Sequence, residues 1–247
     1  CSMLGVFDSG SGGLTVAQTL SKAFPHVSMM YLGDHARSPY GDRPVNEIEQ
    51  YTKECVDWLF AQGCDQVLLA CNTASAVALD YLDDDRVIGI IEPTRDWLST
   101  RDKEDIGLLA TTATVTSGVY SDVVAYQHSC PAWTLFIEKG NPKSEGAKEV
   151  VTRDVNTLIE GRELNTVVLA CTHYPYFHDL LAEILPSDVT VVDQGDMVAN
   201  WLKDHNRPAQ TDGDSALQFF TTDDPIEVSR RAADFFGSPV TFQKATI

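Results

Sequence analysis

The sequence is short of basic residues. Among its 247 residues there are 18 Lys and Arg against 36 Asp and Glu, which gives a formal net charge of −18. Nucleic acids and anionic membrane surfaces are bound through clustered Lys and Arg, so we expect neither as a partner. The same charge repels an anionic substrate, so such a substrate needs hydrogen-bond donors placed locally in its binding site.

Long hydrophobic runs are also missing, since no apolar stretch approaches the ~18 residues of a membrane-spanning helix. The first predicted strand begins at Leu4, so we expect no signal peptide. Six cysteines in 247 residues include no C-x-x-C pair. This pattern favours neither a disulfide framework nor a structural zinc site. We therefore expect a cytoplasmic protein without a metal.

Two nucleotide-binding signatures are absent from the glycine-rich segment 8–13. It does not read G-x-G-x-x-G, and it lacks the lysine of a phosphate-binding loop. A tight turn between a strand and a helix accounts for the glycines by itself. The alternative is that Asp8 and Ser9, at the end of the strand, project toward a ligand. Both interpretations remain open at this point.

Segments of strand length alternate with segments of helical periodicity along the chain. This alternation predicts an α/β fold of mostly parallel sheets with helices on both faces. The expected strands are 4–7, 27–32, 67–70, 87–91, 106–110, 133–137, 167–170, 189–192, 217–221 and 240–242. The expected helices are 14–20, 46–62, 75–82, 115–126, 144–159, 177–185, 197–204 and 224–236.

One pattern occurs twice: an apolar strand that ends in a cysteine, once at Cys71 and again at Cys171. The repeat predicts two similar α/β domains that face each other across a cleft. We assign residues 1–92 and 209–247 to the first domain and 93–208 to the second, with crossings near 92–94 and 206–214. Ligands of such sheets bind beyond the carboxyl ends of the strands, where these cysteines lie.

A buried cysteine most often acts as a small apolar side chain, and we expect this of Cys55, Cys64 and Cys130. Cys71 and Cys171 differ because each lies where a strand gives way to a helix start. Backbone N–H groups at that position lower the pKa of a thiol. His173 is either a hydrogen-bonded residue of the turn or the proton partner of Cys171, and in the second case Asp8 or Asp34 would be the corresponding partner of Cys71.

The sequence resembles glutamate racemases over essentially its whole length. The resemblance rests on four segments in the same order, GVFDSGSGGLT at 5–15, YLGD at 31–34 through Gly41, ACNTAS at 70–75 and ACTHYP at 170–175. Weaker matches are residues 113–117 and 192–193. The sequence departs from the pattern of that family at three places: His35 stands in place of threonine, Thr94 stands in place of glycine, and the pair Gln194-Gly195 follows Asp193.

The resemblance implies an enzyme that interconverts L- and D-glutamate without a cofactor and supplies D-glutamate for bacterial peptidoglycan. It implies a cytoplasmic homodimer with its active site between two α/β domains. Cys71 and Cys171 would be the acid/base catalysts, assisted by Asp8 and His173, with Asp34 a secondary candidate. The substrate would contact Asp8, Ser9, Pro39, Tyr40, Gly41, Asn72, Thr73, Thr114, Thr172 and His173.

Three other functions fit parts of the sequence. A racemase for aspartate or another acidic amino acid would use the same two thiols with a different pocket. A Cys–His amidohydrolase would need only one cysteine and would form an acyl adduct on it. An amino-acid-binding protein fits two lobes and a cleft but gives two poised thiols no purpose.

Overall fold

The computed structural model describes residues 2–208 and 215–247, and its strands form two sheets. In the described residues every strand pairing is parallel, with orders β10-β9-β2-β1-β3-β4 and β6-β5-β7-β8. The strands are β1 (Met3–Asp8), β2 (Ser28–Gly33), β3 (Gln66–Leu69), β4 (Val87–Gly89), β5 (Ile106–Ala110), β6 (Tyr126–Ser129), β7 (Thr166–Ala170), β8 (Thr190–Val192), β9 (Leu217–Thr221) and β10 (Phe242–Lys244).

In the described residues a helix separates each strand from the next, and the predicted α/β fold is confirmed. The α-helices are α1 (Leu14–Ala23), α2 (Val45–Ala61), α3 (Asn72–Leu82), α4 (Ile91–Ser99), α5 (Thr112–Ser117), α6 (Pro131–Glu138), α7 (Glu145–Ile159), α8 (His178–Ile184), α9 (Gly195–Asp204) and α10 (Pro225–Phe236). Short 3-10 helices are η1 (His35–Arg37), η2 (Lys103–Asp105) and η3 (Tyr174–Phe177). Within the described residues, no helix is long and apolar enough to cross a membrane.

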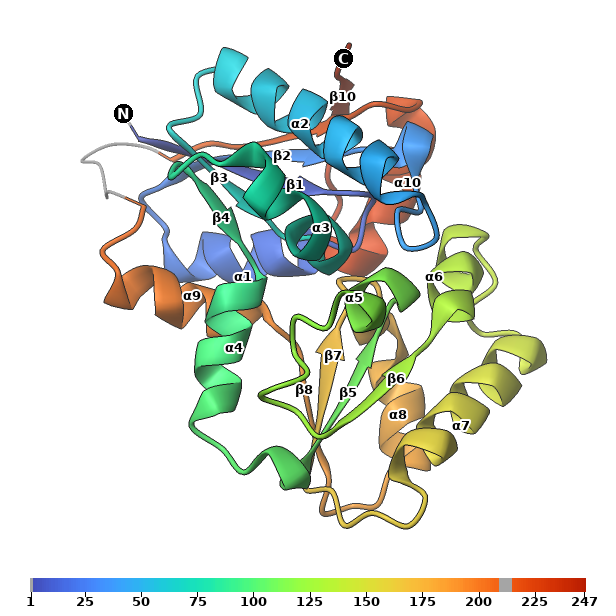
Figure 1. The fold of residues 1–247 in the computed structure, drawn as a ribbon. Coiled ribbons are helices and arrows are strands. Elements are labelled where there is room, and N and C mark those ends of the chain that lie inside the picture. Colours follow the sequence, from blue (N-terminus) through green and yellow to red (C-terminus); the bar gives the residue numbers. More distant parts are fainter. Residues whose placement is uncertain (1, 209–214) are drawn as a thin grey trace.

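The larger sheet is covered on both faces, by α1 and α10 on one side and by α2 and α3 on the other (Figure 1). Alternate side chains of β1 enter the two cores: Leu4 and Val6 pack with α1, whereas Phe7 packs with α2. The first and last parts of the chain both lie in this half of the molecule (Figure 1).

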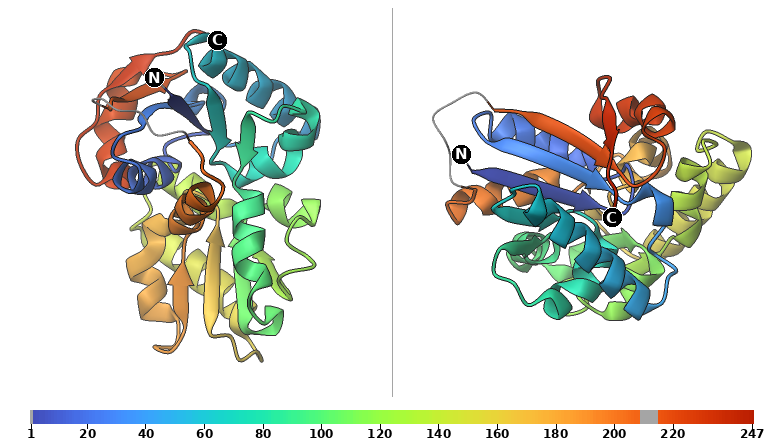
Figure 2. Two further views of the ribbon diagram at one scale, coloured as in Figure 1. Left: turned by 90° about the vertical axis from the view of Figure 1, so that its left-hand side faces the viewer. Right: turned by 90° about the horizontal axis from the view of Figure 1, so that it is seen from above.

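The smaller sheet shares a core with the larger one. On its outer face, Leu109 and Leu169 pack with α6, α7 and α8. On its inner face, Leu108 and Val168 belong to the same continuous apolar cluster as Leu4. Helix α4 connects the larger sheet to the smaller one and runs alongside the smaller sheet, and α9 packs against α1 and α4 (Figures 1 and 2). The carboxyl ends of the two sheets are thereby held facing each other.

Two expectations about local structure were wrong. Residues 133–137 are not a strand but lie in α6, and 115–126 is not one helix, because α5 ends at Ser117 and β6 begins at Tyr126. The first proposed crossing, 92–94, lies inside α4, since proline is tolerated in the first turn of a helix. The second crossing, 206–214, extends outside the described residues, and the domain boundaries stay a prediction.

Candidate active site

The carboxyl ends of strands from both sheets meet at one cleft. Segments that follow β1, β3, β5 and β7 all contribute to its lining. Both Cys71 and Cys171 line it, each about 6% exposed. The lining residues are Ser9, Pro39, Tyr40, Gly41, Asp42, Cys71, Asn72, Thr73, Thr111, Thr112, Pro131, Thr134, Cys171, Thr172 and His173.

Cys71 is the N-cap of α3. Its sulfur accepts a hydrogen bond from the backbone N–H of Ala74 at 3.4 Å and lies 3.7 Å from the hydroxyl of Ser9, to which the thiol donates. Burial and the nearby charge of Asp8 raise the pKa of the Cys71 thiol to about 12. The N–H of Ala74 opposes this shift, as expected for a helix start, but burial outweighs it. Cys71 is therefore held as a neutral thiol in this arrangement.

Cys171 follows β7 directly and contacts an imidazole. Nδ1 of His173 lies 3.9 Å from its sulfur, and Nε2 of His173 lies 2.6 Å from Oε1 of Glu138. Burial lowers the pKa of His173, but its hydrogen bonds to Cys171 and Glu138 outweigh burial and hold that pKa well above its ordinary value. The pKa of Glu138 is lowered, because the contact with His173 outweighs burial. His173 and Glu138 thus form an ion pair behind the thiol.

Glu138 was not predicted as a site residue. It is the last residue of α6, and Pro131 and Thr134 of the same helix line the cleft. Positions 131, 134 and 138 lie on one helical face, so a helix assignment for this segment would have placed Glu138 on the same face as the two lining residues. Because residues 133–137 were expected to form a strand, the shared face of Pro131, Thr134 and Glu138 was not predicted.

Hydrogen bonds between hydroxyl and carboxylate groups join the sheets at the cleft. The hydroxyl of Thr172 donates to Oδ1 of Asp8 at 3.0 Å, and the hydroxyls of Thr73 and Thr111 lie 2.9 Å apart. The turn after β1 approaches the same point, because a Cβ on Gly12 would lie 2.7 Å from the backbone carbon of Thr172. The close approach of the two backbone segments therefore requires glycine at position 12, and this contact explains the glycine without a bound nucleotide.

Three predicted residues do not line the cleft. Asp8 is fully buried behind it, and burial raises the pKa of its carboxyl. Thr114 lies behind Thr111, whose hydroxyl donates to it at 3.0 Å, so Thr111 and Thr112 line the cleft in its place. Both were overlooked although they directly follow β5.

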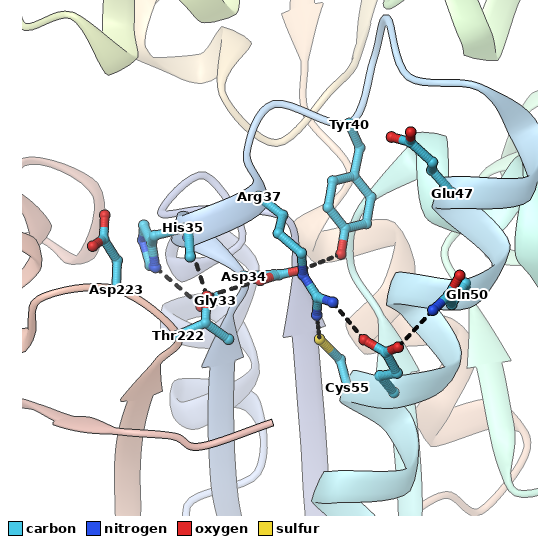
Figure 3. Close-up of polar contacts among 12 residues, drawn as sticks. Gly33, Asp34, His35, Arg37, Tyr40, Glu47, Gln50, Cys55, Thr222 and Asp223 are labelled. Carbon is cyan, nitrogen blue, oxygen red and sulfur yellow. Dashed lines mark hydrogen bonds and ion pairs between the residues drawn. The ribbon is translucent and has the colours of Figure 1, made fainter.

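Asp34, the third of these residues, anchors the segment 39–42, which lines the cleft. Its carboxylate accepts hydrogen bonds from the hydroxyl of Tyr40, from Nε of Arg37 at 2.7 Å and from the hydroxyl of Thr222 at 2.8 Å (Figure 3). Tyr40 in turn lines the cleft. Asp34 thus positions the lining residue and does not reach the cleft itself.

The polar lining is mostly neutral. Its described residues include no Lys or Arg, and hydroxyl and amide groups are supplied by Ser9, Asn72, Thr73, Thr111, Thr112, Thr134 and Thr172. Such groups, together with backbone N–H groups at helix starts, bind a carboxylate without a basic cluster. The cleft therefore supplies the local hydrogen-bond donors that an anionic substrate needs in a protein of high negative charge.

One cluster among the described residues has the composition of a metal site: His128, Cys130 and Asp154 bring their ligand atoms within 4.8 Å of one another. The Asp154 carboxylate is already satisfied, by Nε1 of Trp133 at 2.9 Å and by the guanidinium of Arg153 at 3.1 Å. The guanidinium of Arg153 already supplies the positive charge beside Asp154. The hydrogen bond from Trp133 of α6 to Asp154 of α7 links these two helices, so we interpret the cluster as structural.

Comparison with known proteins gives concordant results. The family described as Asp/Glu/Hydantoin racemase matches residues 14–202. A glutamate racemase of Aquifex aeolicus is 35% identical, with 96% of this chain and 95% of the relative aligned. The crystal structure of a glutamate racemase isoform from Bacillus anthracis superposes with a TM-score of 0.90 at 28% identity, covering 100% of this chain and 98% of that one. A Francisella tularensis glutamate racemase in complex with D-glutamate gives 0.87 at 26% identity, covering 100% and 97%.

Proposed function

The chain belongs to the glutamate racemase family and is an amino-acid racemase, an isomerase, and we propose that it interconverts L- and D-glutamate by moving a proton at Cα. The observation that carries this proposal is that Cys71 and Cys171 line a single cleft from two different sheets. Their arrangement suits a reaction that needs one proton acceptor and one proton donor on opposite faces of the same carbon.

Two bases fit racemisation better than one. A single base would require the deprotonated intermediate to turn over before the proton returns. With thiols on both faces the substrate stays in place, and the two protonation states exchange at each turnover. Cys171 deprotonates L-glutamate and Cys71 deprotonates D-glutamate in this proposal.

Contacts on the Cys171 side support its role as the initial base. The imidazole of His173 lies within 3.9 Å of the sulfur and is paired with Glu138 on its far side. A protonated imidazole stabilises a thiolate beside it. His173 is thus proposed to poise Cys171, and Glu138 to hold His173 in place and in its charged form.

Contacts on the Cys71 side support the complementary role. The pKa of about 12 keeps Cys71 protonated, mainly through burial and then through the charge of Asp8. A thiol in this state is ready to donate its proton to the second face of Cα. Asp8, behind Thr172 and close to Cys71, is proposed to adjust this thiol and not to touch the substrate.

The deprotonated intermediate carries its charge into the α-carboxylate. Donors fixed before the reaction stabilise such charge best, because they need not reorganise. Asn72, Thr73 and Thr172 are proposed to hold the two carboxylates of glutamate, with Ser9, Pro39, Tyr40 and Gly41 completing the pocket. The two threonines do so through their backbone N–H groups, because the hydroxyl of Thr172 already donates to Asp8 and that of Thr73 to Thr111. Thr114 supports Thr111 from behind. No cofactor is required in this scheme, and a cytoplasmic homodimer that supplies D-glutamate for peptidoglycan is part of the proposal.

A substrate panel followed by circular dichroism tests the proposal. The purified enzyme should racemise both enantiomers of glutamate at equal kcat/KM, since mirror-image substrates have an equilibrium constant of unity. Faster racemisation of aspartate than of glutamate would assign the chain to the competing substrate. An acyl adduct on one cysteine, seen by mass spectrometry without racemisation, would favour the amidohydrolase reading.

A further inference from the structure

Gln194 lies between the two sheets, and its side-chain amide is paired with that of Asn72. Nδ2 of Asn72 donates to Oε1 of Gln194 at 2.6 Å, and Nε2 of Gln194 donates to Oδ1 of Asn72 at 2.9 Å. Asn72 begins α3, after β3 of the larger sheet, and Gln194 is the N-cap of α9, after β8 of the smaller sheet. This reciprocal pair is buried, with 2% and 3% exposure.

Two hydroxyl groups complete the arrangement. The hydroxyl of Tyr120 donates to Oδ1 of Asn72 at 2.8 Å. Nε2 of Gln194 donates to the hydroxyl of Thr94 at 2.9 Å and lies 3.2 Å from that of Tyr120. Thr94 donates its own proton to the carbonyl of Ile90 at 2.8 Å, so its oxygen is free to accept. We name the side chains of Asn72, Thr94, Tyr120 and Gln194 the amide lock.

Counting donors and acceptors fixes the orientation of Asn72. A primary amide has two N–H groups and two oxygen lone pairs. Gln194 and Tyr120 use both lone pairs of Oδ1, and Gln194 accepts from one N–H. The second N–H has no partner in the described part of the chain. Turning the amide over would oppose N–H to N–H and carbonyl to carbonyl within a buried pair, which is costly.

Asn72 lines the cleft next to Cys71. We propose that Gln194 is a positioning residue that acts through Asn72, so that the remaining N–H of Asn72 is presented to a carboxylate of the substrate. Thr94 orients Gln194, and Tyr120 orients Asn72. Thr94 and Gln194 are two of the positions at which the sequence departs from the family pattern, and the amide lock joins them in one hydrogen-bonded unit. The inference rests on the proposed glutamate racemase function.

Gln194→Ala tests the inference by kinetics. Losing an oriented donor to a carboxylate weakens binding of the substrate and of the transition state, in which that donor faces the developing charge, so KM should rise and kcat/KM should fall roughly 10-fold. Tyr120→Phe and Thr94→Val each remove one hydroxyl with little change of shape and should raise KM by about 2- to 5-fold. If Gln194→Ala does not fold, these two variants test the role of the amide lock in its place.

Thr52→Val is the matched control. Thr52 is fully buried in α2, away from the cleft lining, and its hydroxyl has no hydrogen-bond partner among the described residues. The same Thr-to-Val change should therefore leave KM and kcat unaltered. A rise in KM in this control equal to that in Thr94→Val would attribute the effect to general loosening and overturn the inference.

A double-mutant cycle separates positioning from a merely structural role. If Gln194 acts only through Asn72, the Asn72→Ala, Gln194→Ala double variant should have the same kcat/KM as Asn72→Ala alone. Fold-losses that multiply in the double variant would overturn the inference.

The side-chain ¹⁵N–¹H signals of Asn72 provide a readout that needs no activity. They should shift in Gln194→Ala without substrate. An unshifted pair of signals together with an unchanged KM contradicts the amide lock. If the wild-type protein does not racemise glutamate but these signals shift as expected, the proposed function fails and the amide lock stands.

Discussion

Nε2 of His173 lies 2.6 Å from Oε1 of Glu138, while Nδ1 of the same ring lies 3.9 Å from the sulfur of Cys171. One imidazole therefore connects a buried carboxylate to a thiol of the cleft. Because α6 carries Glu138 and the segment after β7 carries His173, the contact depends on how the helix packs against the smaller sheet.

Glu138→Gln should lower kcat/KM by about 10²-fold, a value in the range for groups that support general acid–base catalysis. Because the equilibrium constant of racemisation is unity, the loss must be equal from either enantiomer. The asymmetry appears in the primary deuterium isotope effect, which should be larger with Cα-deuterated L-glutamate, since proton transfer with Cys171 becomes limiting. Glu149→Gln, at an exposed position, is the control. Equal isotope effects from both enantiomers would contradict the assignment.

Glu138→Gln should also be less stable than the wild type in a defined pH window. The pKa of His173 is raised above 6.5, so its contribution is complete below 6.5 and disappears as the pH rises through the folded-state value. The pKa of Glu138 is lowered below 4.5, so its contribution is complete above 4.5 and disappears as the pH falls through the folded-state value. Urea unfolding at about pH 5.5 should show Glu138→Gln less stable than wild type by about 1.5–3 kcal/mol. A difference that stays constant into acid and alkali would contradict the ion pair.

Cys71→Ala and Cys171→Ala should each reduce racemisation by about 10⁴-fold or more while the protein stays folded. The serine variants should keep only a trace, because an alkoxide is much harder to form than a thiolate. Circular dichroism measures both the rate and the fold. Cys64→Ala, which changes a buried thiol outside the cleft lining, should remain active. Substantial racemisation by either alanine variant would refute the two-base scheme.

Asp8→Asn should make Cys71 more reactive. The charge of Asp8 helps to raise the pKa of Cys71 to about 12, at which a thiol is only about 10⁻⁴ ionised near pH 8. Removing that charge should speed alkylation of Cys71 by iodoacetamide roughly 3- to 10-fold, as followed by peptide mass spectrometry. Asp154→Asn removes a buried carboxyl beside Cys130 and should leave the Cys71 rate unaltered. An unchanged or slower rate in Asp8→Asn would count against a charge effect.

Exhaustive dialysis against a chelator, without pyridoxal phosphate, should leave the racemisation rate unchanged, because the proposed chemistry uses only side chains. A rate that falls and then recovers on addition of a divalent metal would contradict the cofactor-free scheme.

The sequence predicts the fold and the cysteine pair well because both depend on strong local patterns. Apolar strands such as β1 and β7 end abruptly at polar residues, and the repeat at Cys71 and Cys171 identifies two equivalent strand ends. Residues 126–129 escaped detection because β6 is an edge strand of half-buried polar residues without an apolar period.

Long-range contacts account for the remaining differences. Trp133 and Ile137 read as a strand, but Pro131 starts a helix, and Nε1 of Trp133 bonds Asp154 of α7. The local sequence pattern does not reveal that tertiary contact. It therefore does not reveal where Glu138 lies either. Gln194 likewise contacts Asn72 only because the larger sheet, which contains β3, packs against the smaller sheet, which contains β8.

The most direct test of the two-thiol account is a single-turnover reaction of L-glutamate in deuterated water. Two facing bases predict that the first D-glutamate formed carries solvent deuterium at Cα, while the remaining L-glutamate still carries its original proton. D-glutamate that retains the substrate's own proton would mean that one group serves both faces, and would contradict the account.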